Sequence, residues 1–174
     1  MSSKDIQPTD GAQLDTKAFR AACGRFATGI TVVTTVDAGG NPHGMTVNSF
    51  TSVSLNPPLV LVCVDLRNSI LGHFLDASAY GINILAENQE SVSKRFATSG
   101  TNRFDGMDWR PGDVLGVPLL QSVLATFECV VTQVLELGDH TVLVGEVKAA
   151  SAVEGDPLLY FNSKYQKLLT DNKG

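Results

Sequence analysis

Apolar and β-branched residues gather in seven short stretches of the chain, a pattern typical of β-strands. These stretches cover residues 30–36, 43–47, 59–64, 80–85, 124–135, 141–147 and 158–161. The run 59–64 is apolar throughout, which predicts a strand buried on both faces. Turn-forming residues at 37–42 and 136–140 predict that the flanking strands form two hairpins.

Apolar residues at helical spacing predict three short helices. The first covers residues 14–28, with Asp15 or Thr16 as its N-cap and Gly29 at its end. Ser69 can cap a second helix that follows the strand 59–64.

The third helix is predicted at residues 87–97, with Val92 and Phe96 facing inward. The segment 98–112 holds several glycines and the single Trp109, and its length is typical of a lid or binding loop. Residues 162–169 are expected to form a tail.

Hairpins outnumber strand–helix–strand units in this pattern. We therefore expect a mainly β fold, a mostly antiparallel barrel with Greek-key-like connections and a few short helices. Residues 1–13 are predicted to be a flexible N-terminal tail, and residues 14–174 a single domain.

Composition and charge exclude several classes of protein. The 174 residues are 43% hydrophobic and 18% charged, as in soluble globular proteins. A net charge of −5 without a Lys/Arg cluster argues against a nucleic-acid surface. No apolar run approaches the roughly 20 residues of a membrane span, and residues 1–13 lack the apolar core of a signal peptide. A cytoplasmic protein is expected.

Cysteines and histidines do not predict a metal site or a disulfide. Three cysteines lie far apart without a CxxC motif, which favours packing in the core. His43, His73 and His140 never pair at helical or hairpin spacing, so no metal is expected. Nucleotide motifs are absent too: the pair Gly39 and Gly44 lacks the lysine of a P-loop, and no GxGxxG occurs.

The most unusual stretch is 46–54, where five hydroxyl side chains and one amide follow Gly44. On residue types alone, the commoner interpretation is a hydroxyl-rich antiparallel strand and its turn. The alternative is a rim of hydroxyl and backbone N–H groups that binds an anionic or heteroaromatic ligand. Ser69 is equally open, because a capped helix start can also hold a phosphate.

A resemblance to a known family favours the ligand-binding interpretation of 46–54 over the plain strand and turn. It is carried by the order and spacing of several motifs between about Phe19 and Tyr165, at residues 26–34, 44–60, 74, 83–85, 94–97, 138–140 and 157–161. With these motifs the sequence resembles the short-chain flavin reductases, the reductase components of two-component flavin-dependent monooxygenases.

The resemblance implies an FMN-binding split β-barrel with NAD(P)H:flavin oxidoreductase activity (EC 1.5.1.-). Hydride would pass from NADH or NADPH to FMN or FAD, and the reduced flavin would diffuse to a separate oxygenase component. A homodimer with the flavin near the subunit junction is expected.

It also implies site residues at the positions that match the family. His140 would be the catalytic residue that faces the nicotinamide, although such a turn histidine commonly has no further role. The segment 46–49 would line the flavin ring, Ser69 with 94–96 would hold the phosphate, and Asn83 would contact the adenosine of FAD. The implied cofactor-binding residues are Thr28, Gly29, Thr46, Val47, Asn48, Ser49, Ser52, Val53, Ser54, Cys63, Val64, Asp65, Ser69, Asn83, Lys94, Arg95, Phe96, His140 and Tyr165.

Two rival functions share the same barrel. One is a flavin- or heme-binding carrier without reductase activity, in which His140 would have no purpose. The other is an oxidase related to the pyridoxamine-phosphate oxidases, which need more arginine around the flavin than this chain offers. The sequence leaves open the choices between FMN and FAD and between NADH and NADPH, and the identity of the oxygenase.

Overall fold

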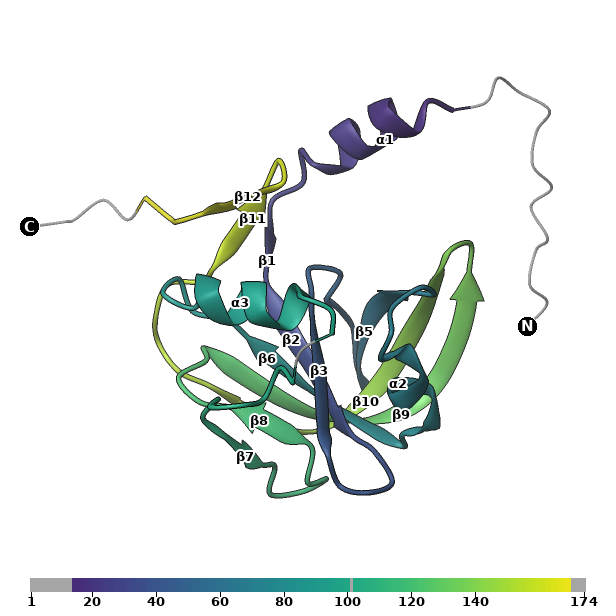
Figure 1. Cartoon of the computed structure of the whole chain (residues 1–174), viewed down its shortest axis with the longest axis vertical. Helices are drawn as coiled ribbons and strands as arrows, with labels where there is room; N and C mark the ends of the chain where they lie inside the picture. The colour runs from purple at the N-terminus through teal and green to yellow at the C-terminus, as the bar shows by residue number, and fades with distance from the viewer. Residues whose placement is uncertain (1–13, 101, 170–174) are drawn as a thin grey trace, which may run out of the picture.

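A computed structural model describes residues 14–100 and 102–169 (Figure 1). The predicted tail at 1–13 lies outside the described residues, and the single-domain assignment stays a prediction. Seven antiparallel strands form one curved sheet in the order β3-β2-β6-β9-β10-β5-β4. Their bounds are β2 Thr31–Val36, β3 Pro42–Val47, β4 Thr51–Leu55, β5 Pro58–Asp65, β6 Ala79–Ile84, β9 Ala125–Leu137 and β10 His140–Ala152.

Smaller elements surround this sheet. The strands β1 Thr28–Gly29, β11 Leu159–Phe161 and β12 Lys164–Gln166 form one small sheet, and β7 Trp109–Pro111 pairs with β8 Pro118–Leu120. The helices are α1 Thr16–Cys23, α2 Leu71–Asp76 and α3 Glu90–Ala97. Helix α3 crosses over the β2–β3 side of the sheet, whereas α1 extends away from the body (Figure 1). None of the three described helices is long and apolar enough to cross a membrane.

Two apolar clusters hold the fold together from opposite faces of β2. Val33 belongs to a cluster with Tyr80, Phe74 and Leu143, and its neighbour Val32 to a cluster with Phe96. Because successive side chains of a strand point to opposite faces, β2 is buried on both. The predicted strand at 59–64 behaves differently: β5 buries only alternate residues. That prediction was wrong because the second face of β5 has no complete cover.

Several predicted boundaries also change. Asp15, one of the two predicted N-caps, caps α1 by accepting a hydrogen bond from Lys17 N at 2.9 Å. The helix ends earlier than predicted, at Cys23, and buries no residue. Ser69 is not the cap of α2, which starts at Leu71 without a side-chain cap. The predicted loop 98–112 contains β7, and the predicted tail 162–169 contains β12. Both strands are three residues long, too short to show a periodic pattern.

The cysteines confirm the core-packing expectation only in part. Cys129 is buried, Cys63 is half-buried, and Cys23 is exposed on α1. Burial raises the pKa of the Cys129 thiol to about 12.

Candidate functional site

The gap in the sheet lies where the chain passes from β3 to β4. These two strands are the ends of the seven-stranded order, yet they follow one another in sequence. The segment 46–54 therefore bridges the two open edges. Edge strands carry backbone N–H and C=O groups without a partner strand, so the mouth of the split sheet offers hydrogen-bonding groups to a ligand.

The inner wall of this mouth is a groove of about 200 Å³, which we call the Thr46 groove. Thr46 Oγ1 donates to the carbonyl of Ser93 at 2.7 Å, and Ser93 Oγ lies 3.0 Å from Tyr165 Oη. The structure thus brings Tyr165, from the C-terminal strand β12, to the predicted ring-binding segment. The groove is lined by Ile30, Thr46, Val47, Asn48, Ser93, Ala97, Tyr160 and Tyr165.

The opposite side of the mouth, which we call the β5–β10 bank, is formed by the paired strands β5 and β10. Ser49 Oγ donates to the carbonyl of Cys63 at 3.0 Å and accepts from its N–H at 2.9 Å, which fixes the rim to β5. Asp65 lies opposite His140 in the β5–β10 register. The pKa of the Asp65 carboxyl is lowered, first by the Arg67 guanidinium, whose Nη2 lies 2.7 Å from Oδ2. Cys63, Asp65 and His140 therefore share one bank.

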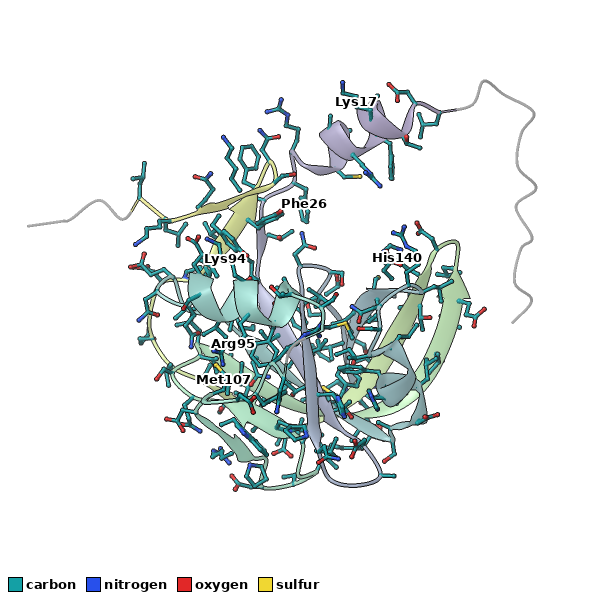
Figure 2. All side chains as sticks on the ribbon, in the orientation of Figure 1. Lys17, Phe26, Lys94, Arg95, Met107 and His140 are labelled. Atoms are coloured by element: carbon teal, nitrogen blue, oxygen red, sulfur yellow. The ribbon has the colours of Figure 1, made fainter. Side chains whose placement is uncertain are left out.

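His140 itself stands at the end of this bank. Its Nδ1 lies 2.7 Å from Asp139 Oδ1, and this bond lowers the pKa of the Asp139 carboxyl. The imidazole is 43% exposed, so its ring can reach a ligand from solvent. Figure 2 shows His140 well separated from Lys94 on α3, on the other side of the mouth.

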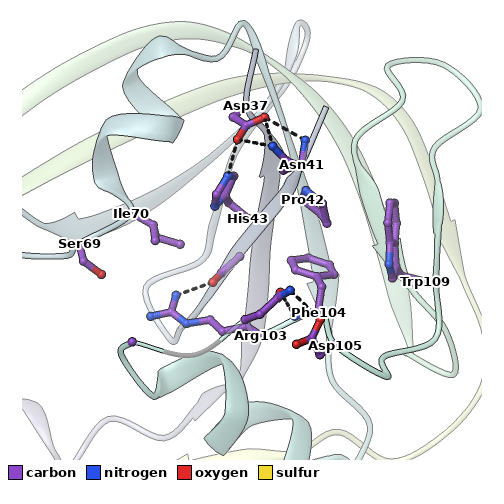
Figure 3. Close-up of a pocket in the computed structure, with 13 residues that line it drawn as sticks. Asp37, Asn41, Pro42, His43, Ser69, Ile70, Arg103, Phe104, Asp105 and Trp109 are labelled. Carbon is purple, nitrogen blue, oxygen red and sulfur yellow. Dashed lines mark hydrogen bonds and ion pairs between the residues drawn. The ribbon is translucent and has the colours of Figure 1, made fainter. Parts of the chain in front are cut away.

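A larger hollow, the Arg103 cleft, lies beyond the outer half of β3. Its volume is about 680 Å³, and Figure 3 shows Arg103 at its floor with Ser69 on one wall and Trp109 on the other. Its lining residues are Asp37, Asn41, Pro42, His43, Gly44, Ser69, Ile70, Gly100, Asn102, Arg103, Phe104, Asp105 and Trp109.

Arg103 is the functional candidate that sequence reasoning missed. Arg103 is only 8% exposed, and burial lowers the pKa of its guanidinium. Its Nε donates to the carbonyl of Thr98 at 2.8 Å and its Nη1 to that of Gly44. Within residues 14–100 and 102–169, no carboxylate pairs with it. A buried cation without a counter-ion favours an anionic ligand. Only its place in a long glycine-containing loop could have drawn attention to it.

The predicted phosphate residues on α3 are engaged elsewhere. Lys94 Nζ lies 2.6 Å from Glu90 Oε1, and this contact raises the pKa of the lysine. The Nη1 of Arg95 donates to the carbonyl of Asp105. Both side chains are exposed on the helix, so Ser69 is the predicted phosphate residue that lies beside Arg103.

Three other predicted site residues are buried by the fold. Asn83 is 0% exposed, with Nδ2 donating to Val32 O at 3.0 Å and Oδ1 accepting from Leu120 N at 2.8 Å. The expectation that Asn83 contacts an adenosine is therefore wrong. The side chains of Val64 and Phe96 belong to the two apolar clusters, so only their backbones can face a ligand.

The remaining predicted residues lie at the margins. Ser52 and Val53 are exposed on β4, with Ser54 half-buried. Thr28 and Gly29 form β1, and Thr28 Oγ1 is buried without a hydrogen-bond partner among the described residues. An unpartnered buried hydroxyl is consistent with a ligand that supplies the missing bond.

The fold is a split antiparallel barrel with a groove at its mouth and a cleft that contains the buried Arg103. In a comparison with protein families, the sequence model of the family described as "flavin reductase like domain" matches residues 23–169 of this chain. The chain therefore belongs to the flavin reductase-like family.

Individual relatives agree with this assignment. The chain is 44% identical over 146 residues to the FMN reductase (NADH) SmoA of Agrobacterium fabrum, covering 84% of this chain and 82% of that protein. It is 41% identical over 158 residues to HsaB of Mycobacterium tuberculosis, named as the reductase subunit of a flavin-dependent monooxygenase, covering 88% and 83%. Relatives differ in length, and the chain spans only 43% of a Rhizobium meliloti protein with which it shares 47% identity over 135 residues.

A solved structure shows the same fold. The NADH:FAD oxidoreductase SgcE6 of Streptomyces globisporus, in complex with NAD and FAD fragments, superposes with a TM-score of 0.85 at 35% identity. The match covers 93% of this chain and all of that one (100%). The predicted split β-barrel is confirmed.

Proposed function

We propose that this protein is an NADH-dependent flavin reductase that supplies reduced flavin to a separate oxygenase. The observation that carries the proposal is the pairing of an open edge-strand mouth at 46–54 with a buried Arg103 that no carboxylate of the described residues neutralises. The names of SmoA and SgcE6 support NADH as the hydride donor and FMN or FAD as the acceptor. The name of HsaB supports the oxygenase partner.

The residues of the mouth would hold the flavin ring. Thr46, Val47 and Asn48 lie on the edge strand or just after it, where their backbone groups can reach the ring atoms. Cys63 and Asp65 would border the ring from β5, and Tyr165 would close the groove. Thr28, whose buried Oγ1 has no hydrogen-bond partner in the described part of the chain, would meet the ribityl chain.

The phosphate end would lie in the Arg103 cleft. Arg103 offers a fixed guanidinium, and Ser69 a hydroxyl, to the phosphate oxygens. This assignment replaces Lys94 and Arg95 as the main phosphate residues because both are already engaged on the surface of α3.

The bound flavin and nicotinamide supply the redox chemistry, so the chain needs no nucleophile of its own. Its task is to hold the two rings in contact and to keep water from between them. His140, held by Asp139, would donate to the nicotinamide side of the pair. A site made mostly of backbone groups and one buried cation suits reversible binding, which a diffusible product requires.

The proposal is tested with purified protein, NADH, and excess FMN or FAD. We expect NADH absorbance at 340 nm to fall with either flavin and to stay constant without flavin. If NADH is stable with both flavins while flavin still binds, the protein is a carrier and not a reductase. The same assay with NADPH determines the nicotinamide preference.

A homodimer would cover the exposed N-terminal arm, which is helix α1 with its flanking residues from Leu14 to Phe26. Helix α1 buries no residue, and Leu14, Phe19 and Phe26 are 67%, 55% and 77% exposed beside it. Apolar side chains on a helix normally pack against another element. Because α1 projects from the body (Figure 1), we propose that it packs on a second copy. With an NADH substrate and free cysteines, we assign the protein to the cytoplasm.

Replacing Phe26 with glutamate is expected to weaken this dimer by about 30-fold or more, because a phenylalanine contributes roughly 2–3 kcal/mol when buried. Light scattering coupled to size exclusion measures the dissociation. Lys17→Glu, on the same arm (Figure 2), is the matched control and should leave the dimer intact. A wild-type protein that is monomeric at micromolar concentration would contradict the interface.

A further inference from the structure

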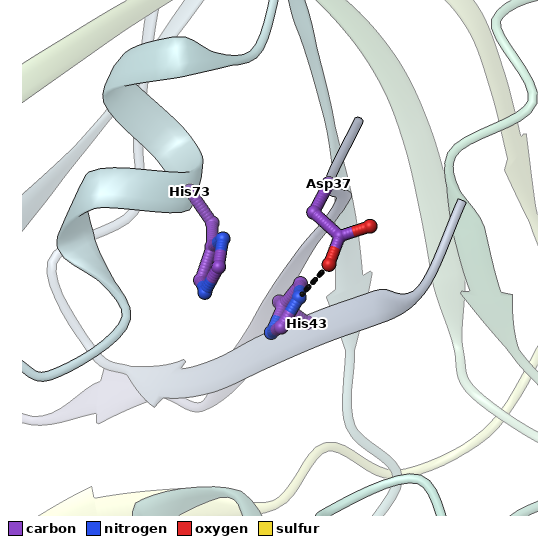
Figure 4. Close-up of side chains that lie close together, drawn as sticks. All are labelled: Asp37, His43 and His73. Atoms are coloured by element: carbon purple, nitrogen blue, oxygen red, sulfur yellow. Dashed lines mark hydrogen bonds and ion pairs between the residues drawn. The ribbon is translucent and has the colours of Figure 1, made fainter. Parts of the chain in front are cut away.

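The fold brings together three metal-ligating side chains from separate segments at the far end of the Arg103 cleft. Asp37 follows β2, His43 lies on β3, and His73 lies on α2 (Figure 4). One ligand atom from each lies within 4.8 Å of the others. Sequence spacing could not predict this meeting, because it depends on α2 packing against the β2–β3 hairpin.

The carboxylate is held in place and ionised. Asp37 Oδ1 accepts hydrogen bonds from the N–H groups of Gly39 and Asn41, each at 2.9 Å, so the turn fixes its direction. The His43 bond first, and the Asn41 bonds next, lower the pKa of the Asp37 carboxyl. Among the described residues no lysine or arginine pairs with Asp37, and its charge faces the imidazoles.

Each imidazole has at least one ring nitrogen without a hydrogen-bond partner among the described residues. His43 Nε2 lies 3.0 Å from Asp37 Oδ2, and its Nδ1 has no hydrogen-bond partner within the described chain. Neither ring nitrogen of His73 has a partner there either. Imidazole nitrogen and carboxylate oxygen are ligands that Zn²⁺ and other first-row divalent ions prefer.

The rings are stacked, with centroids 3.6 Å apart and planes inclined by 12°. Parallel rings at this distance cannot both aim at one ion, so binding requires one ring to rotate. His73 is the ring that can rotate, because no hydrogen bond from the described part of the chain fixes it and it is half-buried on the short helix α2. Rotation about χ1 of histidine exchanges staggered rotamers, and rotation about χ2, a broad and roughly two-fold torsion, turns the plane of the ring.

Space for the ion and its water ligands lies on both sides of the cluster. Asp37 and His43 line the Arg103 cleft, and Asp37 and His73 line a second hollow of about 310 Å³. Asp37 and His43 side chains are each 23% exposed, which leaves an entry path without full exposure.

We propose that Asp37, His43 and His73 form a binding site for a divalent first-row transition ion, of which Zn²⁺ is the best match. Three protein ligands and one or two waters would complete its coordination. Bound metal would link the β2–β3 hairpin to α2 at the outer wall of the Arg103 cleft. The site does not depend on the reductase activity, so it can fail while the proposed function holds.

Metal binding is tested on full-length, metal-free protein without a histidine tag. We expect calorimetry to show one Zn²⁺ per chain, and Co²⁺ to give the visible absorption of a site with nitrogen ligands. Zn²⁺ should also raise the melting temperature. His73→Gln should weaken Zn²⁺ binding by at least about 100-fold, since even partners of metal ligands contribute 10–100-fold.

The chain supplies its own control. His140 is the only other histidine and also lies beside an aspartate, with Nδ1 2.7 Å from Asp139 Oδ1. His140→Gln should bind Zn²⁺ like the wild type. Unchanged Zn²⁺ affinity in His73→Gln, or no Co²⁺ absorption with the wild type, would overturn the proposal. His43→Gln gives a second test, and a melt of each variant without metal shows that it is folded.

Discussion

Replacing Arg103 with methionine is expected to raise the dissociation constant of FMN by about 10–100-fold, because a hydrogen bond to a charged group contributes roughly 1.5–3 kcal/mol. Methionine keeps the apolar length of the side chain but removes the buried cation that faces the cleft. Quenching of flavin fluorescence on titration with protein measures the constant.

Riboflavin separates this role from a purely structural one. Arg103 also bonds the carbonyls of Thr98 and Gly44, so its loss can disturb the cleft itself. Riboflavin carries the same ring as FMN without the phosphate, and its affinity should change little if Arg103 binds phosphate. Equal weakening of FMN and riboflavin would show that Arg103 only supports the cleft. Ser69→Ala, which removes no side-chain hydrogen bond among the described residues, should raise the dissociation constant of FMN by a smaller factor.

The fold was largely predictable because most of its pairings are local. The hairpin β2–β3 and the long hairpin β9–β10 join strands that are neighbours in sequence, with turn residues between them. The sequence did not reveal which strands are buried on both faces. Apolar content marked 59–64, but β2, with three threonines, and β6, with an asparagine, are buried on both faces. Thr34 and Thr35 of β2 are tolerated there because their hydroxyls donate to the carbonyls of Pro118 and Ala79.

Pairings between distant short strands could not be predicted. Thr28 of β1 lies opposite Tyr160 of β11, and each strand has only two or three residues. Such pairs depend on the finished sheet rather than on their own pattern. The segment 162–169, predicted to be a tail, contains β12, which pairs with its sequence neighbour β11 but is too short to show a periodic pattern.

Site residues followed the same division. The fold brings residues 46–48 of the predicted ring-binding segment to one groove with Tyr165, whereas Ser49 bonds the backbone of Cys63, and their contact with a flavin stays a prediction. Asn83 fails because an amide on a strand looks the same in sequence whether it binds a ligand or the backbone of Val32 and Leu120. Arg103 and the cluster around Asp37 were missed because their neighbours come from segments whose packing no periodicity encodes.

Gly145→Ala is expected to destabilise the protein by about 3 kcal/mol, the upper range for overpacking a tight core. A Cβ atom at this position would lie 2.5 Å from Tyr80 Oη and 2.8 Å from Cys129 Cβ. Tyr80 is 1% exposed and Cys129 is 0% exposed, so neither can move aside into solvent. At about 2–4 °C for each kcal/mol in a chain of this size, the melting temperature should fall by about 10 °C.

Two further variants identify the cause of that loss. In Gly72→Ala, on the exposed side of α2, the new Cβ meets no atom within 4 Å, and alanine should stabilise the helix by roughly 0.5–1 kcal/mol. Tyr80→Phe removes the oxygen that would be closest to the new methyl group, so it should recover part of the stability lost in Gly145→Ala. Additive effects of Tyr80→Phe and Gly145→Ala would show that the contact with Tyr80 Oη is not the source of strain. A melting temperature for Gly145→Ala equal to that of the wild type would mean that the β9–β10 bulge at Val144–Gly145 can shift and make room for the side chain.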